Sequence, residues 1–174
     1  HLRVPTPKAY QKEMADQMGV SVDEIKALVD DLHEFNPMLG HRGCRLGNTY
    51  PEITEMQARA IIEAAVNLKK KGVDAHPEIM VPLIGTVQEF QMQEEIIRTT
   101  ADAIDERRSD RGDYHGGGLI EIPRAALTAD DIAKHAEFFS FGTNDLTQMG
   151  LAYSRDDAGK FLPIYIKKGI LKVD

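Results

Sequence analysis

Residues 119–145 have the sequence LIEIPRAALTADDIAKHAEFFSFGTND, in which two short apolar runs flank a stretch with helical character. The runs Leu119–Ile122 and Phe138–Phe141 are short enough to be strands buried on both faces, as parallel strands joined by helices are. A weak capping pattern at Thr128 predicts a short helix to about His135. The stretch therefore predicts a strand–helix–strand unit of an α/β protein.

The residues before this unit repeat the pattern. A third apolar run, Ile79–Leu83, predicts another strand, and the polar segment Ser109–Gly118 predicts a long loop. Three further capping pairs predict helix starts: Ser21 with Glu24 for a helix over Val22–His33, Thr54 with Gln57 for one to about Lys71 that ends at Gly72, and Thr86 with Glu89 for one to about Arg107. This order of elements favours either an open doubly wound sheet or about three consecutive units of a (β/α)₈ barrel with N-terminal helices.

The composition excludes several classes of function. The 174 residues carry a net charge of −7, so we expect neither nucleic acid nor an anionic membrane as a partner. No stretch approaches the roughly 20 apolar residues of a membrane-spanning helix. The single cysteine cannot form an internal disulfide, which favours a cytoplasmic compartment. Because the chain starts at His1, we expect both ends to continue into a longer protein, whose upstream part can carry an organellar address.

Two carboxylates follow neighbouring predicted strands. Glu121 lies in or at the end of the strand near Leu119, and Asp145 follows the next strand in a predicted turn rich in oxygen ligands. Because parallel strands end at the same edge, the two side chains are expected to converge there. Two converging carboxylates suit Mg²⁺, which takes oxygen ligands and keeps sites for substrate and water. The alternative is a structural ion pair between Glu121 and Arg124 or another arginine.

A Gly-rich loop and a lone cysteine complete the candidate residues. Asn36–Arg45 sets Arg42 and Arg45 among glycines, so a guanidinium can approach a phosphate or carboxylate, although solvated surface arginines explain the pattern equally well. Cys44 has no visible histidine and acid partner, which favours a small buried apolar role over a nucleophile. The residues alone thus indicate a magnesium-assisted α/β site for a small anion.

At the same positions the chain resembles the C-terminal domain of the pyruvate phosphate dikinase family. The segment 137–148, EFFSFGTNDLTQ, matches the pattern of phosphoenolpyruvate-utilising enzymes in general. Two segments, 120–130 (IEIPRAALTAD) and 154–161 (SRDDAGKF), are similar to the dikinases in particular. The resemblance covers nearly the whole chain, and it implies that residues 1–174 are part of a (β/α)₈ barrel that binds phosphoenolpyruvate (PEP) and pyruvate.

The resemblance also implies residue roles. Glu121 and Asp145 would bind Mg²⁺ and substrate, and Arg42 would contact the substrate phosphate. Gly142, Thr143 and Asn144 would line the substrate site. The expected catalytic residues are therefore Arg42, Glu121 and Asp145. The pattern of the family's proton-donor cysteine does not include Cys44.

The reaction implied for the parent enzyme interconverts ATP, phosphate and pyruvate with AMP, diphosphate and PEP. Phosphate would be carried on a phosphohistidine domain, which we expect, like the nucleotide-binding domain, outside this chain. The resemblance implies a homodimeric parent and predicts that the fragment alone is inactive. PEP synthase and enzyme I of the sugar phosphotransferase system share the Gly142–Asp145 pattern and remain alternatives, as does a non-catalytic PEP-binding fragment.

Overall fold

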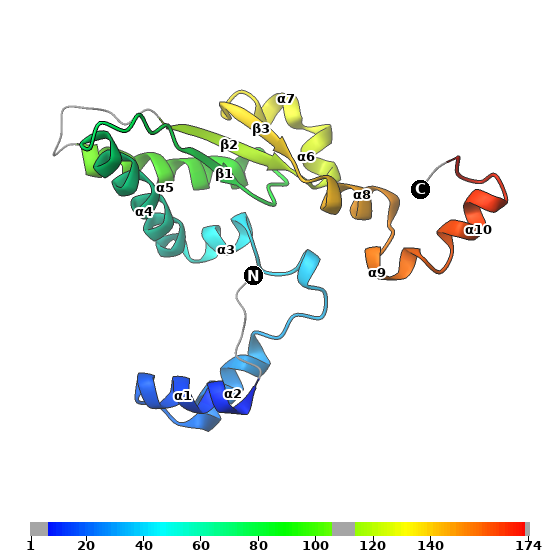
Figure 1. The fold of residues 1–174 in the computed structure, drawn as a ribbon, viewed down its shortest axis with the longest axis horizontal. Helices are drawn as coiled ribbons and strands as arrows, with labels where there is room; N and C mark the ends of the chain where they lie inside the picture. The colour runs from blue at the N-terminus through cyan, green and yellow to red at the C-terminus, as the bar shows by residue number, and fades with distance from the viewer. Residues whose placement is uncertain (1–6, 106–113, 173–174) are drawn as a thin grey trace. The chain divides into compact units, whose positions relative to one another are not determined.

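The computed structural model describes residues 7–105 and 114–172. The chain divides into two compact units, residues 1–42 and 43–174. Figure 1 shows the elements of each unit in chain order. The predicted helix end near Arg107 and the first part of the predicted loop from Ser109 lie outside the described residues.

The first unit is a helical hairpin. It contains α1 (Lys8–Met18) and α2 (Val22–Asp31), followed by the short 3₁₀ helix η1 (Pro37–Leu39). The predicted capping box at the start of α2 is confirmed: the Glu24 N–H donates to Ser21 Oγ at 3.2 Å, and the Ser21 N–H donates to Glu24 Oε2 at 2.8 Å. Helix α2 ends two residues before the predicted end.

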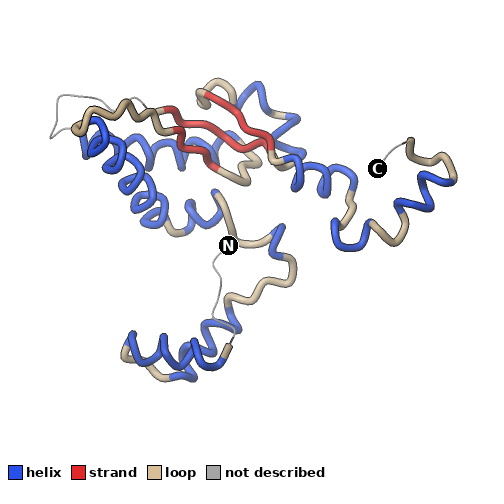
Figure 2. The backbone as a smooth tube through the Cα atoms, in the orientation of Figure 1, coloured by secondary structure: helices blue, strands red, loops and turns tan. Residues whose placement is uncertain are grey.

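The second unit is built on a parallel sheet. Its strands, β1 (Glu78–Val81), β2 (His115–Ile120) and β3 (Phe138–Phe141), pair in the order β1-β2-β3 (Figure 2). Both pairings are parallel, so all three strands end at the same edge. Consecutive parallel strands joined by helices confirm the α/β class and fit part of a (β/α)₈ barrel.

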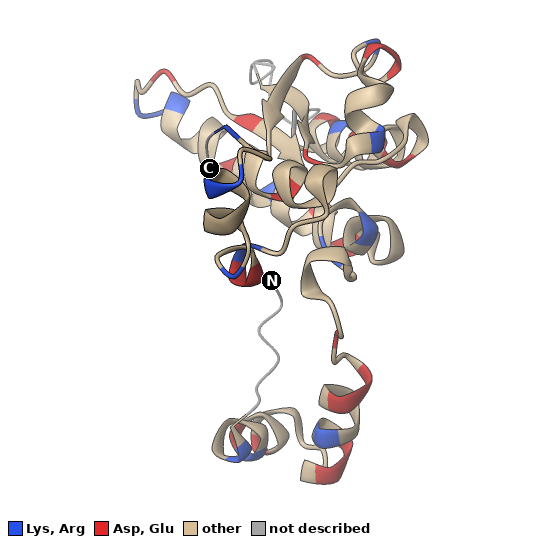
Figure 3. Ribbon diagram, turned by 90° about the vertical axis from the view of Figure 1, so that its right-hand side faces the viewer, with Lys and Arg blue, Asp and Glu red and all other residues tan. Residues whose placement is uncertain are grey.

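Eight helices of the second unit are described: α3 (Cys44–Thr49), α4 (Pro51–Lys69), α5 (Val87–Asp105), α6 (Pro123–Leu127), α7 (Ala129–Ile132), α8 (Thr143–Leu151), α9 (Arg155–Ala158) and α10 (Leu162–Lys167). The hydrophobic core includes residues from the sheet and from α3 to α7, with Ile84, Phe90 and Ile132 at most 1% exposed. Within the described part of the chain, no helix is long and apolar enough to cross a membrane. Lys and Arg are interspersed with Asp and Glu on the helices (Figure 3).

The boundaries of β2 differ from the prediction. The strand starts at His115 and ends at Ile120, whereas the sequence predicted Leu119–Ile122 and assigned Gly116–Gly118 to a loop. The glycines pair with β1 on one side, and Gly117 and Gly118 also pair with β3 on the other. A Cβ on Gly117 would lie 2.5 Å from the Phe138 carbonyl oxygen. Tertiary packing here requires residues that strand propensity disfavours.

Two predicted caps are wrong in detail. Helix α4 starts at Pro51, three residues before Thr54, because proline suits the first turn of a helix. The Thr54 hydroxyl instead donates to Gln93 Oε1 on α5 at 2.7 Å. Thr128 precedes α7 without capping it, since its hydroxyl donates to the Arg124 carbonyl at 3.0 Å. The Thr86–Glu89 box before α5 is confirmed, with bonds of 2.9 and 3.3 Å.

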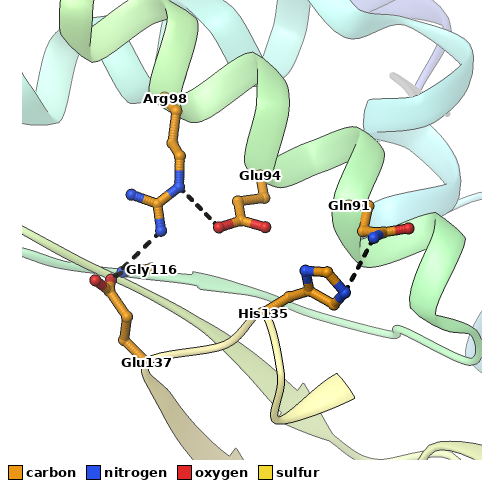
Figure 4. Close-up of polar contacts among 6 residues, drawn as sticks. All are labelled: Gln91, Glu94, Arg98, Gly116, His135 and Glu137. Atoms are coloured by element: carbon orange, nitrogen blue, oxygen red, sulfur yellow. Dashed lines mark hydrogen bonds and ion pairs between the residues drawn. The ribbon is translucent and has the colours of Figure 1, made fainter. Parts of the chain in front are cut away.

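Charged residues join α5 to the amino-terminal ends of β2 and β3 (Figure 4). Arg98 Nε donates to Glu94 Oε1 at 2.7 Å, and Arg98 Nη2 lies 3.9 Å from Glu137 Oε2. The same Glu137 oxygen accepts the Gly116 N–H at 2.6 Å. These contacts lie at the opposite end of the strands from Glu121.

Candidate functional site

The carboxyl ends of β2 and β3 bring two predicted site residues together. Ile120 is opposite Phe141 in the parallel register, so Glu121 and Gly142 follow the two strands side by side. The Gly142 N–H extends the ladder by donating to the Ile120 carbonyl at 3.0 Å. In parallel α/β proteins this edge is where ligands bind.

Glu121 is buried at this edge, with 3% of its surface exposed. Its Oε1 accepts a hydrogen bond of 2.6 Å from the Leu83 N–H, which comes from the turn after β1. A Cβ on Gly142 would lie 2.7 Å from Glu121 Oε2, so a larger residue at position 142 would displace the carboxylate. Burial of an ionised carboxylate is costly unless hydrogen bonds, charged partners or a metal compensate for it.

The turn after β1 has an unusual backbone. Leu83 is 1% exposed and has φ +60°, a left-handed conformation that costs a non-glycine residue on the order of 1–3 kcal/mol. Its carbonyl accepts a hydrogen bond of 3.1 Å from the Cys44 thiol, and the Pro82 carbonyl accepts the Cys44 N–H at 3.0 Å. Burial, followed by the negative charge of Glu89, raises the pKa of Cys44 to about 12. Cys44 is 1% exposed, which confirms the predicted buried role.

The segment 142–145 is the start of a helix rather than an extended turn. Gly142 precedes α8, and Thr143, Asn144 and Asp145 form its first turn, where the helix dipole favours anions. The Asp145 side chain is half-buried, whereas Thr143 and Asn144 are exposed.

Asn144 is held by a contact within the same unit. Its Oδ1 accepts a hydrogen bond from Arg155 Nη2, and the Arg155 N–H donates to Gln148 Oε1 at 3.0 Å. Gln148 Nε2 in turn donates to the Asn144 carbonyl at 3.3 Å. Arg155 therefore orients the side-chain amide of Asn144, a residue predicted to line the substrate site.

Arg42 lies in the first unit, whereas Glu121 and residues 142–145 lie in the second. Its guanidinium Nε and Nη2 both donate to the Met38 carbonyl, at 3.0 and 2.8 Å. This fork connects the side chain to Met38, within the predicted Asn36–Arg45 loop. Its role toward substrate stays a prediction.

The donor set at the second unit's strand ends suits Mg²⁺. Among the described residues, no three His, Cys, Asp or Glu side chains gather into a metal-binding group. Mg²⁺ does not need such a group, because it is usually held by one or two carboxylates together with substrate oxygens and waters. Glu121, directly after β2, and Asp145, in the first turn of α8 after β3, supply that number of carboxylates.

Three contributors to the site were not predicted from the sequence. The Leu83 N–H was missed because a backbone group leaves no residue-type signal. Gly43 was not distinguished from its glycine neighbours, although its φ of +58° and its position against Leu83 both require glycine. Arg155 lies in the segment 154–161, which resembles the dikinases, and this resemblance was the only sequence feature that pointed to Arg155.

Comparisons with known proteins show the family to which the chain belongs. A family model described as "PEP-utilising enzyme, PEP-binding domain" matches residues 9–165. The chain is 54% identical over 175 residues to pyruvate, phosphate dikinase of Clostridium symbiosum, which covers 100% of this chain and 20% of that protein. It is 59% identical over 162 residues to the chloroplastic pyruvate, phosphate dikinase 1 of Arabidopsis thaliana, covering 93% of this chain and 17% of the relative. The chain thus spans at most about a fifth of these curated relatives.

Proposed function

Because the chain belongs to the family of PEP-binding domains of PEP-utilising enzymes, we propose that it is the part of a pyruvate phosphate dikinase that binds PEP and pyruvate. Identities of 54% and 59% to two dikinases, over 100% and 93% of this chain, support the dikinase over PEP synthase and enzyme I. The complete protein would interconvert ATP, phosphate and pyruvate with AMP, diphosphate and PEP. Its nucleotide-binding and phosphohistidine domains would lie outside residues 1–174.

The observation that carries the proposal is the buried Glu121 beside Gly142. Glu121 and Asp145 would hold Mg²⁺ together, one from each neighbouring strand end. When bound, the ion supplies positive charge to the pyruvate oxygen that becomes negative as the enolate forms. The burial of Glu121 at 3% exposure supports this role, since electrostatic interactions are stronger where water is excluded.

The other residues would bind and orient the substrate. Gly142, Thr143 and Asn144 would line the substrate site, and the N–H groups of Thr143 and Asn144 in the first turn of α8 would face the anionic substrate, as helix N-termini do in many phosphate sites. Arg155 would keep the Asn144 amide in one orientation through its hydrogen bond to Oδ1. Arg42 would bind the transferring phosphate, for which the guanidinium fork is suited.

A coupled assay of the complete protein tests the proposal. We expect ATP consumption that depends on both pyruvate and phosphate. Glu121→Gln should lower kcat by at least about a hundredfold, the order expected for loss of one group that stabilises the transition state. Glu95→Gln makes the same chemical change at an exposed position of α5 and should leave kcat unchanged. Absence of pyruvate-dependent turnover would favour the non-catalytic alternative, and full activity of Glu121→Gln would remove Glu121 from the site.

A further inference from the structure

The turn after β1 contacts the candidate metal-binding acid on one side and α3 on the other. The Leu83 N–H donates to Glu121 Oε1 at 2.6 Å, and the Leu83 carbonyl accepts from the Cys44 thiol at 3.1 Å. Leu83, Cys44 and Glu121 are exposed by only 1%, 1% and 3%. The backbone N–H and carbonyl of the buried Leu83 therefore connect Glu121 to Cys44.

The left-handed backbone conformation of Leu83 in this turn depends on contacts with neighbouring residues. A leucine with φ +60° is in a sparsely populated region, and such residues persist only where the surrounding structure constrains them. Cys44 supplies two of the constraints, through its N–H to the Pro82 carbonyl at 3.0 Å and its thiol to Leu83. The Leu83 N–H belongs to the Pro82–Leu83 peptide, which the Cys44 N–H holds, and the Leu83 carbonyl belongs to the next peptide, which the thiol holds. Loss of the thiol bond would release the second peptide and relax the constrained φ of Leu83, which would shift the Leu83 N–H relative to Glu121.

Helix α3 can act as the support because it is fixed on its far side. Gln93 of α5 is 3% exposed, and its Nε2 donates to Asn48 Oδ1 at 2.6 Å. Its Oε1 accepts from Thr54 Oγ1 of α4 at 2.7 Å. At the near side, a Cβ on Gly43 would lie 2.8 Å from Leu83 Cβ. Only glycine there lets the start of α3 pack against the turn.

We propose that the Pro82–Leu83 turn is a positioning element for Glu121 and that Cys44 is the residue that holds it. The proposal rests on the proposed function, since it assumes that Glu121 binds the metal. The Leu83 N–H fixes the rotation of the carboxylate through Oε1, while Oε2 stays at the end of β3 beside Gly142. Cys44 thus acts through Leu83 and does not touch the substrate. Outer-shell partners of this kind set the orientation of metal ligands.

Manganese binding to the complete protein tests the proposal. Mn²⁺ replaces Mg²⁺ as a paramagnetic probe, and free Mn²⁺ is measured by electron paramagnetic resonance without nucleotide. Cys44→Ala, which removes the donor to Leu83, should weaken Mn²⁺ affinity by roughly tenfold, the lower end of the range for lost outer-shell partners. Cys44→Ser keeps a donor and should stay near the parent affinity. Ile97→Val, a small truncation of a buried residue on α5, is the matched control and should leave the Mn²⁺ affinity unchanged.

Hydrogen exchange of the same variants supplies a second readout. The Leu83 amide should exchange faster in Cys44→Ala and in Glu121→Gln than in the parent or in Ile97→Val. If Cys44→Ala matches Ile97→Val in both measurements while Glu121→Gln loses Mn²⁺, the positioning role is wrong and the proposed function stands. If Glu121→Gln retains full Mn²⁺ affinity, the metal assignment fails and the positioning role fails with it.

Discussion

At the scale of single residues, the hydrogen bonds of the Arg42 guanidinium show which of its properties a lysine at this position would lack. Two of its guanidinium nitrogens already share the Met38 carbonyl, so the side chain uses its fork to stay in place. A lysine keeps the charge but has neither the fork nor the planar shape. Any contribution of Arg42 beyond charge should therefore be lost in Arg42→Lys.

We predict that Arg42→Lys in the complete protein weakens PEP binding by roughly tenfold or more, because one hydrogen bond to a charged group is worth about 1.5–3 kcal/mol. Isothermal titration with PEP measures this change. Arg59→Lys is the control, since Arg59 forms an exposed ion pair with Glu55 on α4. Unchanged PEP affinity in Arg42→Lys would remove Arg42 from the substrate site.

Cys44 provides a residue-scale prediction about pH. Its pKa of about 12 means that the folded protein keeps the thiol neutral where an unfolded chain ionises it. The associated stability is complete below the ordinary thiol pKa and is lost as the pH rises toward about 12. Cys44→Ala should therefore flatten the decline in unfolding free energy on the alkaline side of pH 9.

Chemical modification checks the same property. At pH 8, iodoacetamide should not label Cys44 in the folded protein, because the nucleophile is the thiolate and the side chain is 1% exposed. Peptide mass spectrometry should find the label only after denaturation in urea. Fast labelling of the native protein would contradict both the burial of Cys44 and its raised pKa.

At the scale of elements, the presence of each strand was predictable, but the residues at which β1 and β2 begin and end were not. Apolar runs placed β1 and β3, but the predicted burial on both faces is wrong, because only Ile79 and Val81 of β1 are buried and no residue of β3 is. The start of β2 was missed because Gly116–Gly118 carry no strand signal, and their presence is explained only by how closely β3 and Ile84 approach. The start of α8 was likewise missed: a turn and a helical first turn have similar residue types over Gly142–Asp145. The role of Glu121 and Asp145 stays a prediction, and their placement after β2 and β3 depends on strand order rather than on exact boundaries.

The two ends of the strands are expected to differ in function. Glu137 lies at the amino-terminal end, where it accepts the Gly116 N–H at 2.6 Å and faces Arg98 of α5. In barrels this end serves stability, whereas the carboxyl end carries chemistry. We predict that Glu137→Ala lowers local stability by about 1–3 kcal/mol, since it leaves the buried Gly116 N–H without this acceptor.

Hydrogen exchange on the complete protein measures the effect of Glu137→Ala. Amides of β2 near Gly116 should exchange faster, while kcat and the Mg²⁺ requirement stay at parent values. Lys134→Ala, which removes an exposed ion pair with Asp131, should leave β2 protection unchanged. A large loss of kcat with intact β2 protection would contradict the separation of stability and chemistry between the strand ends.

At the scale of the whole molecule, the chain combines a helical hairpin with an α/β unit that carries the candidate metal ligands. The assignment of Arg42 to the same site as Glu121 and Asp145 comes from the family resemblance. Sequence patterns within one chain do not supply it, because Arg42 precedes β1 and is not related to the strand ends by register. The complete protein is therefore the system in which the site must be examined.

A crystal structure of the complete protein with Mg²⁺ and PEP tests the central claim most directly. The account predicts one ion bonded to a carboxylate oxygen of Glu121 and to one of Asp145, each at about 2.1 Å, with the remaining positions taken by substrate and water. Carboxylates more than roughly 8 Å apart exceed the reach of two such bonds and their side chains. That separation, or an ion bound to neither residue, would contradict the account.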